Sequence, residues 1–200
     1  MELVFATNNE NKLREINHIL GNSFKLLSLK DLKLDNDIPE NEPTLEGNAL
    51  HKAQYIFKIA GKNVFADDTG LEIDALYGLP GVHSARFAGE AKNSDANIDK
   101  VLRMMGASEN RKARFRTVIA LIMDGKEYLF EGRVEGRITD EKRGKEGFGY
   151  DPVFVPEGLE KTFAEMPLGE KNRISHRARA FEKLREFLLA LENPDNKEAV

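Results

Sequence analysis

Along the first half of the chain, short apolar runs alternate with longer segments in which apolar residues recur every three or four positions. Side chains of a strand alternate between two faces, whereas those of a helix return to one face about every 3.6 residues. The pattern therefore predicts repeated strand and helix units, with Gly21, Gly61 and Gly106 ending the helices. The expected strands are 3–6, 24–29, 64–65 and 71–73. The first expected helix is 13–20, the second opens at Thr44 or Asn48 and ends at Ala60, and the third is 94–105, capped by Ser94.

The pattern changes near residue 113, where β-branched and apolar residues become almost continuous. The run 114–123 predicts a strand that Asp124-Gly125 turns into a hairpin. The returning strand, 126–134, is extended by 136–139 or restarts there past a bulge. Helices that alternate with strands, followed by a hairpin, indicate an α/β fold with a mixed sheet. The rest of the chain is expected to hold a loop at 140–149, a strand at 153–155 and a last helix that Ser175 caps and Asn193-Pro194 ends.

The composition is that of a globular domain, with 40% hydrophobic and 32% charged residues. The 200 residues suit one domain, or one domain of two lobes, with a polar tail at 192–200. A net charge of −4 gives no general attraction for nucleic acid, and the absence of cysteine excludes disulfides and thiolate chemistry. No apolar run approaches about 18 residues and the chain opens on a strand, so no membrane association and a cytoplasmic location are expected.

The segment Ala66-Asp67-Asp68-Thr69-Gly70-Leu71 places two adjacent carboxylates between two apolar runs. Because neighbouring side chains of a strand face opposite ways, Asp67 and Asp68 cannot both enter one apolar layer, and at least one is expected to face a cleft. Gly70 would allow a turn that holds both carboxylates at a strand end, where α/β proteins bind ligands. An ordinary surface turn is the competing interpretation.

The polar turn Thr7-Asn8-Asn9-Glu10-Asn11-Lys12 joins the first expected strand to the first expected helix. Its hydroxyl, amides, ammonium and free helix N–H groups suit phosphate oxygens, although the Walker P-loop pattern is absent. Simple capping of the helix by the asparagines and threonine is the alternative.

Cationic and donor groups also gather where the last helix begins, at Lys171, Ser175, His176 and Arg177. Positive charge at the positive end of a helix dipole costs up to ~1 kcal/mol per group unless an anion is bound there. The cluster therefore indicates an anionic ligand, with a solvated basic surface as the alternative.

Two further positions have both a structural and a functional interpretation. Lys52 lies at the edge of the apolar face of its helix, where it contacts a ligand or simply extends to solvent. Phe148, in Phe148-Gly149-Tyr150-Asp151-Pro152, stacks on a base or anchors its loop.

Taken together, these segments resemble the inosine triphosphate pyrophosphatases, a family that hydrolyses dITP, ITP and XTP to the monophosphate and pyrophosphate. The similarity covers nearly the whole chain, and its segments follow the order of the family. They are Thr7-x-Asn9-x-x-Lys12, Glu40 twelve residues before Lys52, Asn48-Ala49-x-x-Lys52-Ala53, Ala66-Asp67-Asp68-Thr69-Gly70-Leu71, Pro80-Gly81-x-x-Ser84-Ala85-Arg86, Phe148-Gly149-Tyr150-Asp151-Pro152 and Lys171-x-x-Ile174-Ser175-His176-Arg177.

The resemblance implies a single two-lobed catalytic domain at 1–191, with a long mixed sheet flanked by helices, an active-site cleft between the lobes and a homodimeric state. It implies that Glu40 and Asp68 hold Mg²⁺, that Asp68 is also the general base, and that Phe148 stacks on the purine. The triphosphate would lie against Thr7, Asn8, Asn9, Glu10, Asn11, Lys12, Lys52, Thr69 and Lys171, and the base or a nearby phosphate against Gly149, Tyr150, Asp151, His176 and Arg177.

The chain departs from the family pattern at a few positions. Asn8 and Asn11 stand where glycine is common, Thr69 where serine is common, and Gly47 where an acidic residue often precedes the asparagine. Asparagine tolerates left-handed backbone better than most residues, so the first turn can keep its shape.

The alternative function is a purine nucleotide sensor that binds without turnover. The intact Asp67-Asp68 pair argues against it, because binding alone favours fewer carboxylates facing phosphates. Among substrates, ITP and XTP are expected to be preferred over ATP, since the donors of Arg177 suit the C6 oxygen of hypoxanthine and xanthine. They are also expected to be preferred over GTP, whose base shares that oxygen and differs from hypoxanthine by a 2-amino group.

Overall fold

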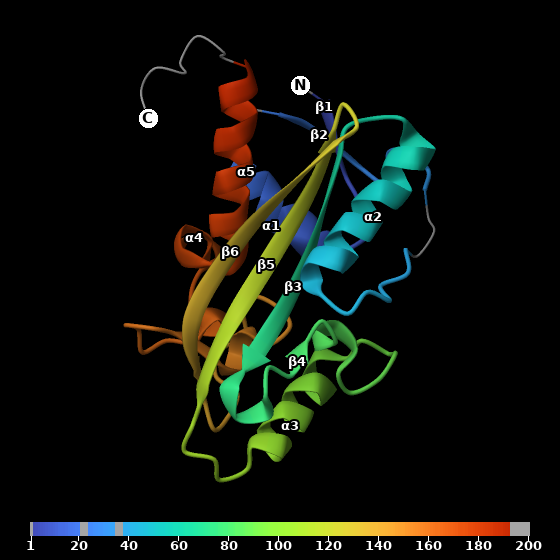
Figure 1. The fold of residues 1–200 in the computed structure, drawn as a ribbon. Coiled ribbons are helices and arrows are strands. Elements are labelled where there is room, and N and C mark those ends of the chain that lie inside the picture. The colour runs from blue at the N-terminus through green and yellow to red at the C-terminus, as the bar shows by residue number, and fades with distance from the viewer. Residues whose placement is uncertain (1, 21–23, 35–37, 193–200) are drawn as a thin grey trace.

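The computed structural model describes residues 2–20, 24–34 and 38–192, and their strands form one mixed seven-stranded sheet. The strands are β1 (Glu2–Phe5), β2 (Lys25–Ser28), β3 (Val64–Ile73), β4 (Pro80–Gly81), β5 (Lys112–Met123), β6 (Lys126–Ile138) and β7 (Phe154–Pro156). β1 pairs in parallel with β2 and β3, whereas the pairs of β3 with β4 and β5, of β5 with β6 and of β6 with β7 are antiparallel. Figure 1 shows β3, β5 and β6 as long twisted strands that run through most of the molecule.

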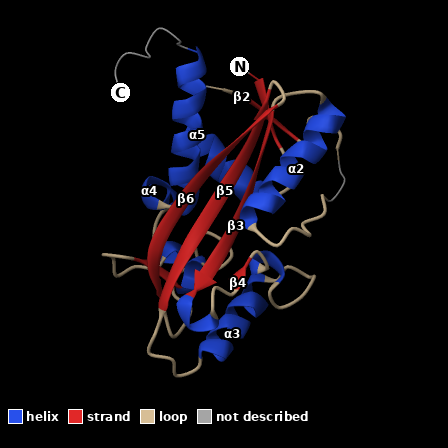
Figure 2. Ribbon diagram, in the orientation of Figure 1, coloured by secondary structure: helices blue, strands red, loops and turns tan. Residues whose placement is uncertain are grey.

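Helices flank this sheet, as predicted (Figures 1 and 2). They are α1 (Glu10–Leu20), α2 (Leu45–Ala60), α3 (Ser94–Met105), α4 (Leu168–Ile174) and α5 (His176–Glu192). α2 packs on one face, where Ala53 and Ala66 share a buried cluster, and α1 and α5 pack on the other, where Phe181 lies 5.7 Å from Phe65 between ring centroids. A separate core surrounds α3 at the end of the sheet where β4 lies, so the molecule has a second centre of packing there.

The aspartate pair lies inside one unbroken strand, and the turn predicted at Gly70 is wrong. β3 keeps its register with β5 through Asp67, Asp68 and Gly70. A Cβ at Gly70 would lie 2.7 Å from the carbonyl oxygen of Gly81, so this glycine lets β4 approach β3 closely. The predicted alternation is confirmed, because Asp67 contacts Lys12 of α1 whereas Asp68 contacts α2 on the opposite face.

Several predicted boundaries are confirmed. Thr44 caps α2 by accepting a hydrogen bond from the Gly47 N–H, and Gly61 ends that helix in left-handed conformation. Asp124 and Gly125 form the hairpin turn with φ of 49° and 77°. Ser175 caps α5 by accepting a hydrogen bond of 3.1 Å from the backbone N–H three residues on. Predictions for Gly21, Asn193-Pro194 and the tail from residue 193 fall outside the described residues.

One predicted boundary is wrong, because Asn93, not Ser94, caps α3 by accepting the hydrogen bond from the Ala96 N–H. Of the two alternatives for 136–139, extension of the strand is confirmed, since β6 continues to Ile138 and one register joins it to β5 throughout, without a bulge. The short helix α4 was not predicted. Within the described residues, no helix has the length and apolar character needed to cross a membrane.

Gly132 on β6 allows α5 to pack directly on the sheet. A Cβ at this position would overlap the carbonyl oxygen of His176 and the backbone nitrogen of Ala180. We therefore expect Gly132→Ala to lower the free energy of unfolding by about 1–3 kcal/mol, measured by urea denaturation. The control is Gly169→Ala in α4, where a Cβ would meet nothing within 4 Å, and it should change that free energy by less than about 1 kcal/mol or raise it. Equal destabilisation by the two substitutions would contradict this explanation.

Candidate active site

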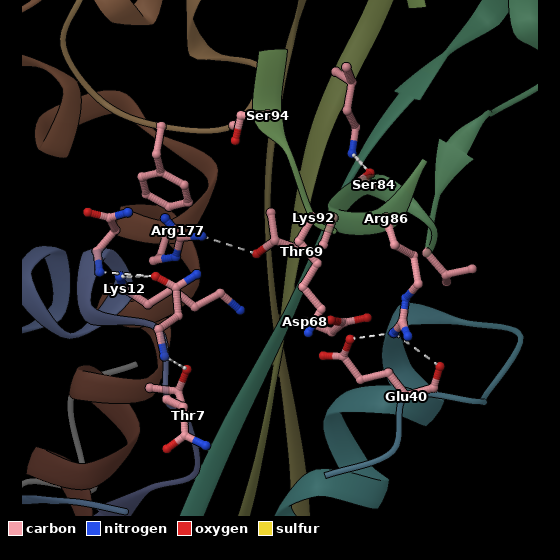
Figure 3. A pocket seen from close by; sticks show the side chains of 18 of the residues that line it. Thr7, Lys12, Glu40, Asp68, Thr69, Ser84, Arg86, Lys92, Ser94 and Arg177 are labelled. Atoms are coloured by element: carbon pink, nitrogen blue, oxygen red, sulfur yellow. Dashed lines mark hydrogen bonds and ion pairs between the residues drawn. The ribbon is translucent and has the colours of Figure 1, made fainter. Parts of the chain in front are cut away.

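A cavity of about 760 Å³ contains nearly all of the predicted site residues, and its volume is in the usual range for small-molecule sites. Figure 3 shows β3 between two walls, one from the first turn and α5, the other from the segments around Glu40 and Arg86. Glu10 is the exception, because its side chain is exposed and pairs with Lys30 at 2.7 Å. The cavity is lined by Thr7, Asn8, Asn9, Asn11, Lys12, Glu40, Lys52, Asp68, Thr69, Phe148, Gly149, Tyr150, Asp151, Lys171, His176 and Arg177.

Lys52 joins the two carboxylates that were predicted to hold a metal. Its Nζ lies 2.8 Å from Glu40 Oε1 and 3.1 Å from Asp68 Oδ1. The second oxygen of Asp68 accepts a hydrogen bond of 3.2 Å from the Asn48 side chain, so both oxygens of this buried carboxylate are held. Lys52 is thus not a surface lysine: α2 presents it to the cavity, and Asn48 of the same helix supports Asp68.

Burial and the lysine charge act in opposite directions on these carboxylates. Burial raises the pKa of Asp68 above its usual value, although Lys52 and Lys12 oppose this effect. At Glu40, burial also acts to raise the pKa, but Lys52 and other cations outweigh it and the pKa is lowered. The pKa values of the two carboxylates therefore shift in opposite directions, and the raised pKa of Asp68 suits a general base.

The donor set of Glu40 and Asp68 is compatible with Mg²⁺ only if a ligand completes it. Within the described residues, no group of three or more histidine, cysteine, aspartate or glutamate side chains is arranged to hold a metal. Mg²⁺ in nucleotide sites commonly takes one or two carboxylates and completes its shell with water and phosphate oxygens. Two hard carboxylates that converge on one cation, the Lys52 ammonium, fit that mode.

On the opposite wall, the cations Lys12, Lys171 and Arg177 line the cavity and pair with buried carboxylates. Lys12 Nζ lies 2.9 Å from Asp67 Oδ2, and Lys171 Nζ lies 2.8 Å from Glu15 Oε1. Arg177 joins these pairs, since its Nη1 donates to Glu15 and its Nε lies 3.7 Å from Asp67 Oδ2. Asp151 Oδ2 lies 2.7 Å from Lys171 Nζ, so three carboxylates balance the three cations and this wall is close to electrically neutral.

This neutrality corrects the argument made from the helix dipole. Lys171 and Arg177 do stand near the start of α5, but buried carboxylates balance them without a bound anion. His176 adds no charge, because burial, together with the nearby cations Arg177 and Lys171, lowers its pKa well below the usual value. Its ring stacks on Phe115 at 4.5 Å between centroids. The solvated basic surface is also wrong, since Lys171, His176 and Arg177 are buried.

The loop that carries Phe148 is held in place by hydrogen bonds and also lines the cavity. Asp151 Oδ2 accepts hydrogen bonds from the Phe148 N–H at 2.8 Å and from Lys171 Nζ at 2.7 Å. The Tyr150 hydroxyl donates to the Ser84 carbonyl at 2.9 Å and so ties the loop to the segment after β4. Asp151 and Tyr150 therefore fix the loop, which leaves Phe148 partly exposed in the wall of the cavity.

Capping accounts for part of the first turn. Asn9 Oδ1 accepts hydrogen bonds from the N–H groups of Asn11 and Lys12, at 3.0 and 3.2 Å, so Asn9 caps α1. Asn8 and Asn11 are exposed and line the cavity. The two interpretations of this turn are thus compatible, because the residue that caps the helix also shapes the wall.

Sequence reasoning missed that Asn48 and Glu15 support the side chains that line the cavity, and it gave no role to Asp67. A signal existed for Glu15, since it follows Lys12 by three residues and the two share one face of α1. A signal also existed for Asp67, because the alternation of β3 directs it away from Asp68 and towards α1 and α5.

A model of the Ham1 family matches residues 3–187 of this chain. The chain belongs to the Ham1 family. The dITP/XTP pyrophosphatase of Porphyromonas gingivalis is 54% identical over 189 residues, which cover 94% of this chain and 97% of the relative. The protein of the same name from Flavobacterium johnsoniae is 52% identical over 190 residues, which cover 95% and 99%.

Solved Ham1 structures agree with the fold. The Ham1 protein of Staphylococcus aureus matches with a TM-score of 0.87 and 40% identity, covering 95% of this chain and 99% of that structure. The Ham1 protein of Coxiella burnetii matches with a TM-score of 0.87 and 38% identity, covering 94% and 98%. The family and the flanked mixed sheet that the motifs predicted are thereby confirmed.

Proposed function

We propose that this protein hydrolyses the nonstandard purine nucleoside triphosphates dITP, XTP and ITP to the monophosphate and pyrophosphate, and so clears them from the nucleotide pool. Membership of the Ham1 family, with relatives named dITP/XTP pyrophosphatase at 52–54% identity, identifies it as a nucleoside triphosphate pyrophosphatase, a hydrolase of acid anhydrides. The observation that carries the mechanism is a buried basic carboxylate, Asp68, held beside Lys52 in a cavity of suitable size.

Asp68 is the proposed general base. Asn48 and Lys52 fix its two oxygens, so it is held in one orientation towards the cavity. Water oriented by this carboxylate attacks the α-phosphorus, and its proton passes to Asp68. Lys12 and Lys52 are placed to stabilise the charge that develops on the phosphate oxygens.

Glu40 and Asp68 are the proposed ligands of Mg²⁺, which would enter with the nucleotide. A triphosphate brings about four negative charges, and a bound Mg²⁺ would neutralise part of the charge on the departing pyrophosphate. Because Lys52 contacts both carboxylates, it keeps them close together before the metal arrives.

Phe148 is the proposed stacking surface for the purine. Lys171 Nζ lies 5.0 Å and Arg177 Cζ 5.3 Å from the centroid of its ring, so donor groups lie close to the ring on which the base would stack. We also propose a homodimer and a cytoplasmic location, which size-exclusion chromatography with light scattering and cell fractionation test.

Pyrophosphate release tests the proposed function directly. Purified protein is incubated with dITP, ITP, XTP or ATP, with Mg²⁺ or with a chelator, and pyrophosphate is assayed. Release from the nonstandard nucleotides with Mg²⁺ supports the proposal. A nucleotide sensor would bind the same compounds, measured by calorimetry, without producing pyrophosphate.

The identity of the products gives a separate prediction. If Asp68 directs water to the α-phosphorus, ITP yields IMP and pyrophosphate in equal amounts, and no IDP. Anion-exchange chromatography of a partial reaction separates these compounds. Accumulation of IDP and orthophosphate would show that cleavage occurs at the terminal phosphate, against the proposed geometry.

A further inference from the structure

The segment Pro80-Gly81-x-x-Ser84-Ala85-Arg86 has no role in the mechanism above, yet it ends in a charged side chain that enters the cavity. Arg86 Nη2 lies 2.6 Å from Glu40 Oε2, and Figure 3 shows this pair on the wall beside Asp68. Glu40 therefore contacts a cation through each of its oxygens, Lys52 through Oε1 and Arg86 through Oε2.

The backbone that carries Arg86 is firmly fixed to the rest of the protein. Ser84 Oγ accepts a hydrogen bond from the Leu71 N–H at 2.9 Å and donates one to the Gly81 carbonyl at 2.6 Å. The Asn97 side chain of α3 donates to the Ala85 carbonyl at 2.9 Å. This motif thus anchors the base of Arg86 to β3 and α3, and only the long side chain is left to change its partner.

Arg86 is also more exposed than the other paired cations of the cavity. Its side chain is 23% exposed, against 14% for Lys12, 7% for Lys52 and 3% or less for Lys171 and Arg177. Its second carboxylate partner, Glu90, is exposed and 3.9 Å away, a weak contact in water. Exchange of its partner therefore costs Arg86 less desolvation than it would cost the buried cations.

A hard metal ion needs a carboxylate oxygen of Glu40 that is now shared with a cation. The triphosphate, in turn, needs more positive charge than the neutral wall of Lys12, Asp67, Arg177 and Glu15 supplies. We propose that Arg86 is a substrate-binding residue that occupies Glu40 in the free protein and transfers its guanidinium to the triphosphate when nucleotide and metal bind. A guanidinium binds two phosphate oxygens side by side, which suits this role.

The proposal rests on the proposed function. For Arg86→Ala it predicts tighter binding of the metal but weaker binding of the nucleotide. Without nucleotide, loss of the competing cation should tighten binding of Mn²⁺, used as the probe for the metal, by roughly threefold. With nucleotide, loss of the guanidinium should raise KM for dITP by about tenfold or more with a smaller change in kcat. A merely structural ion pair predicts the reverse for the metal, because a loosened Glu40 would bind it more weakly.

Binding of Mn²⁺ to the nucleotide-free protein is measured by electron paramagnetic resonance of the free ion, and KM and kcat by pyrophosphate release. Arg86→Lys should recover part of the KM, and the control Arg103→Ala, an exposed residue of α3, should match the wild type in both assays. Weaker or unchanged Mn²⁺ binding, or an unchanged KM, in Arg86→Ala overturns the proposal. Absence of pyrophosphate release by the wild type would instead refute the proposed function, while the Mn²⁺ comparison would still be readable.

Discussion

Asp68→Asn is expected to lower kcat for dITP by about 100-fold or more while nucleotide binding is retained. Asparagine keeps the size of the side chain and can still accept a hydrogen bond, but it has neither the charge nor the basicity of the carboxylate. Lys52 stays paired with Glu40 at 2.8 Å in the variant, so its ammonium is not left alone. Pyrophosphate release gives kcat, and calorimetry with a nonhydrolysable dITP analogue gives the binding constant.

Asp74→Asn is the matched control for this substitution. Asp74 directly follows β3 and pairs with Arg114 at the surface, outside the cavity, so its replacement should leave kcat unchanged. A near-normal kcat in Asp68→Asn would remove both the base and the metal ligand from the proposed mechanism. A loss of binding as large as the loss of kcat would assign Asp68 to substrate binding alone.

The layers of this fold can be predicted from the sequence because side chains alternate between the two faces of a strand. Alternation along β3 sends Asp67 and Asp68 to opposite faces, and both directions are observed. The same alternation did not reveal that the strand continues through Gly70. What sets that conformation is the close approach of the Gly81 carbonyl, a contact between segments that no local pattern encodes.

The charged wall shows a second limit of sequence reasoning. The gathering of Lys171 and Arg177 near a helix start suggested a bound anion, because the dipole rule considers only one helix. Their partner Glu15 lies 156 and 162 residues away along the chain, on α1. Long-range pairing of this kind decides whether a cationic cluster attracts a ligand, and it becomes visible only in the folded structure.

The donors around Phe148 are expected to set the selectivity for the base. We expect kcat/KM for ITP and XTP to exceed that for ATP by as much as ~10⁴-fold. A site that donates a hydrogen bond to the C6 oxygen of the base leaves its buried donors unpaired when the wrong base is bound. Hypoxanthine and xanthine present an oxygen at C6, where adenine presents an amino group. Lys171 and Arg177, whose charged groups lie over the Phe148 ring, have only hydrogen-bond donors in their side chains. GTP shares the C6 oxygen and is also expected to be disfavoured, through its 2-amino group.

Arg177 is the residue with which to test this selectivity, and the structure decides which substitution is informative. Arg177→Ala should narrow the ratio of kcat/KM for ITP to that for ATP, but it removes one of the two cations that contact Glu15 and Asp67, which keep Lys171 and Lys12, and this loss costs up to about 3–5 kcal/mol in stability. Arg177→Lys keeps the charge and loses the planar pair of donors, so a narrower ratio in this variant reports recognition of the base. Arg173→Ala, an exposed position of α4, serves as the control with an unchanged ratio. The two values of kcat/KM are compared within each protein, so a loss of folded enzyme cancels from their ratio. Comparable kcat/KM for ITP and ATP in the wild type would overturn the assignment of the donors to the base.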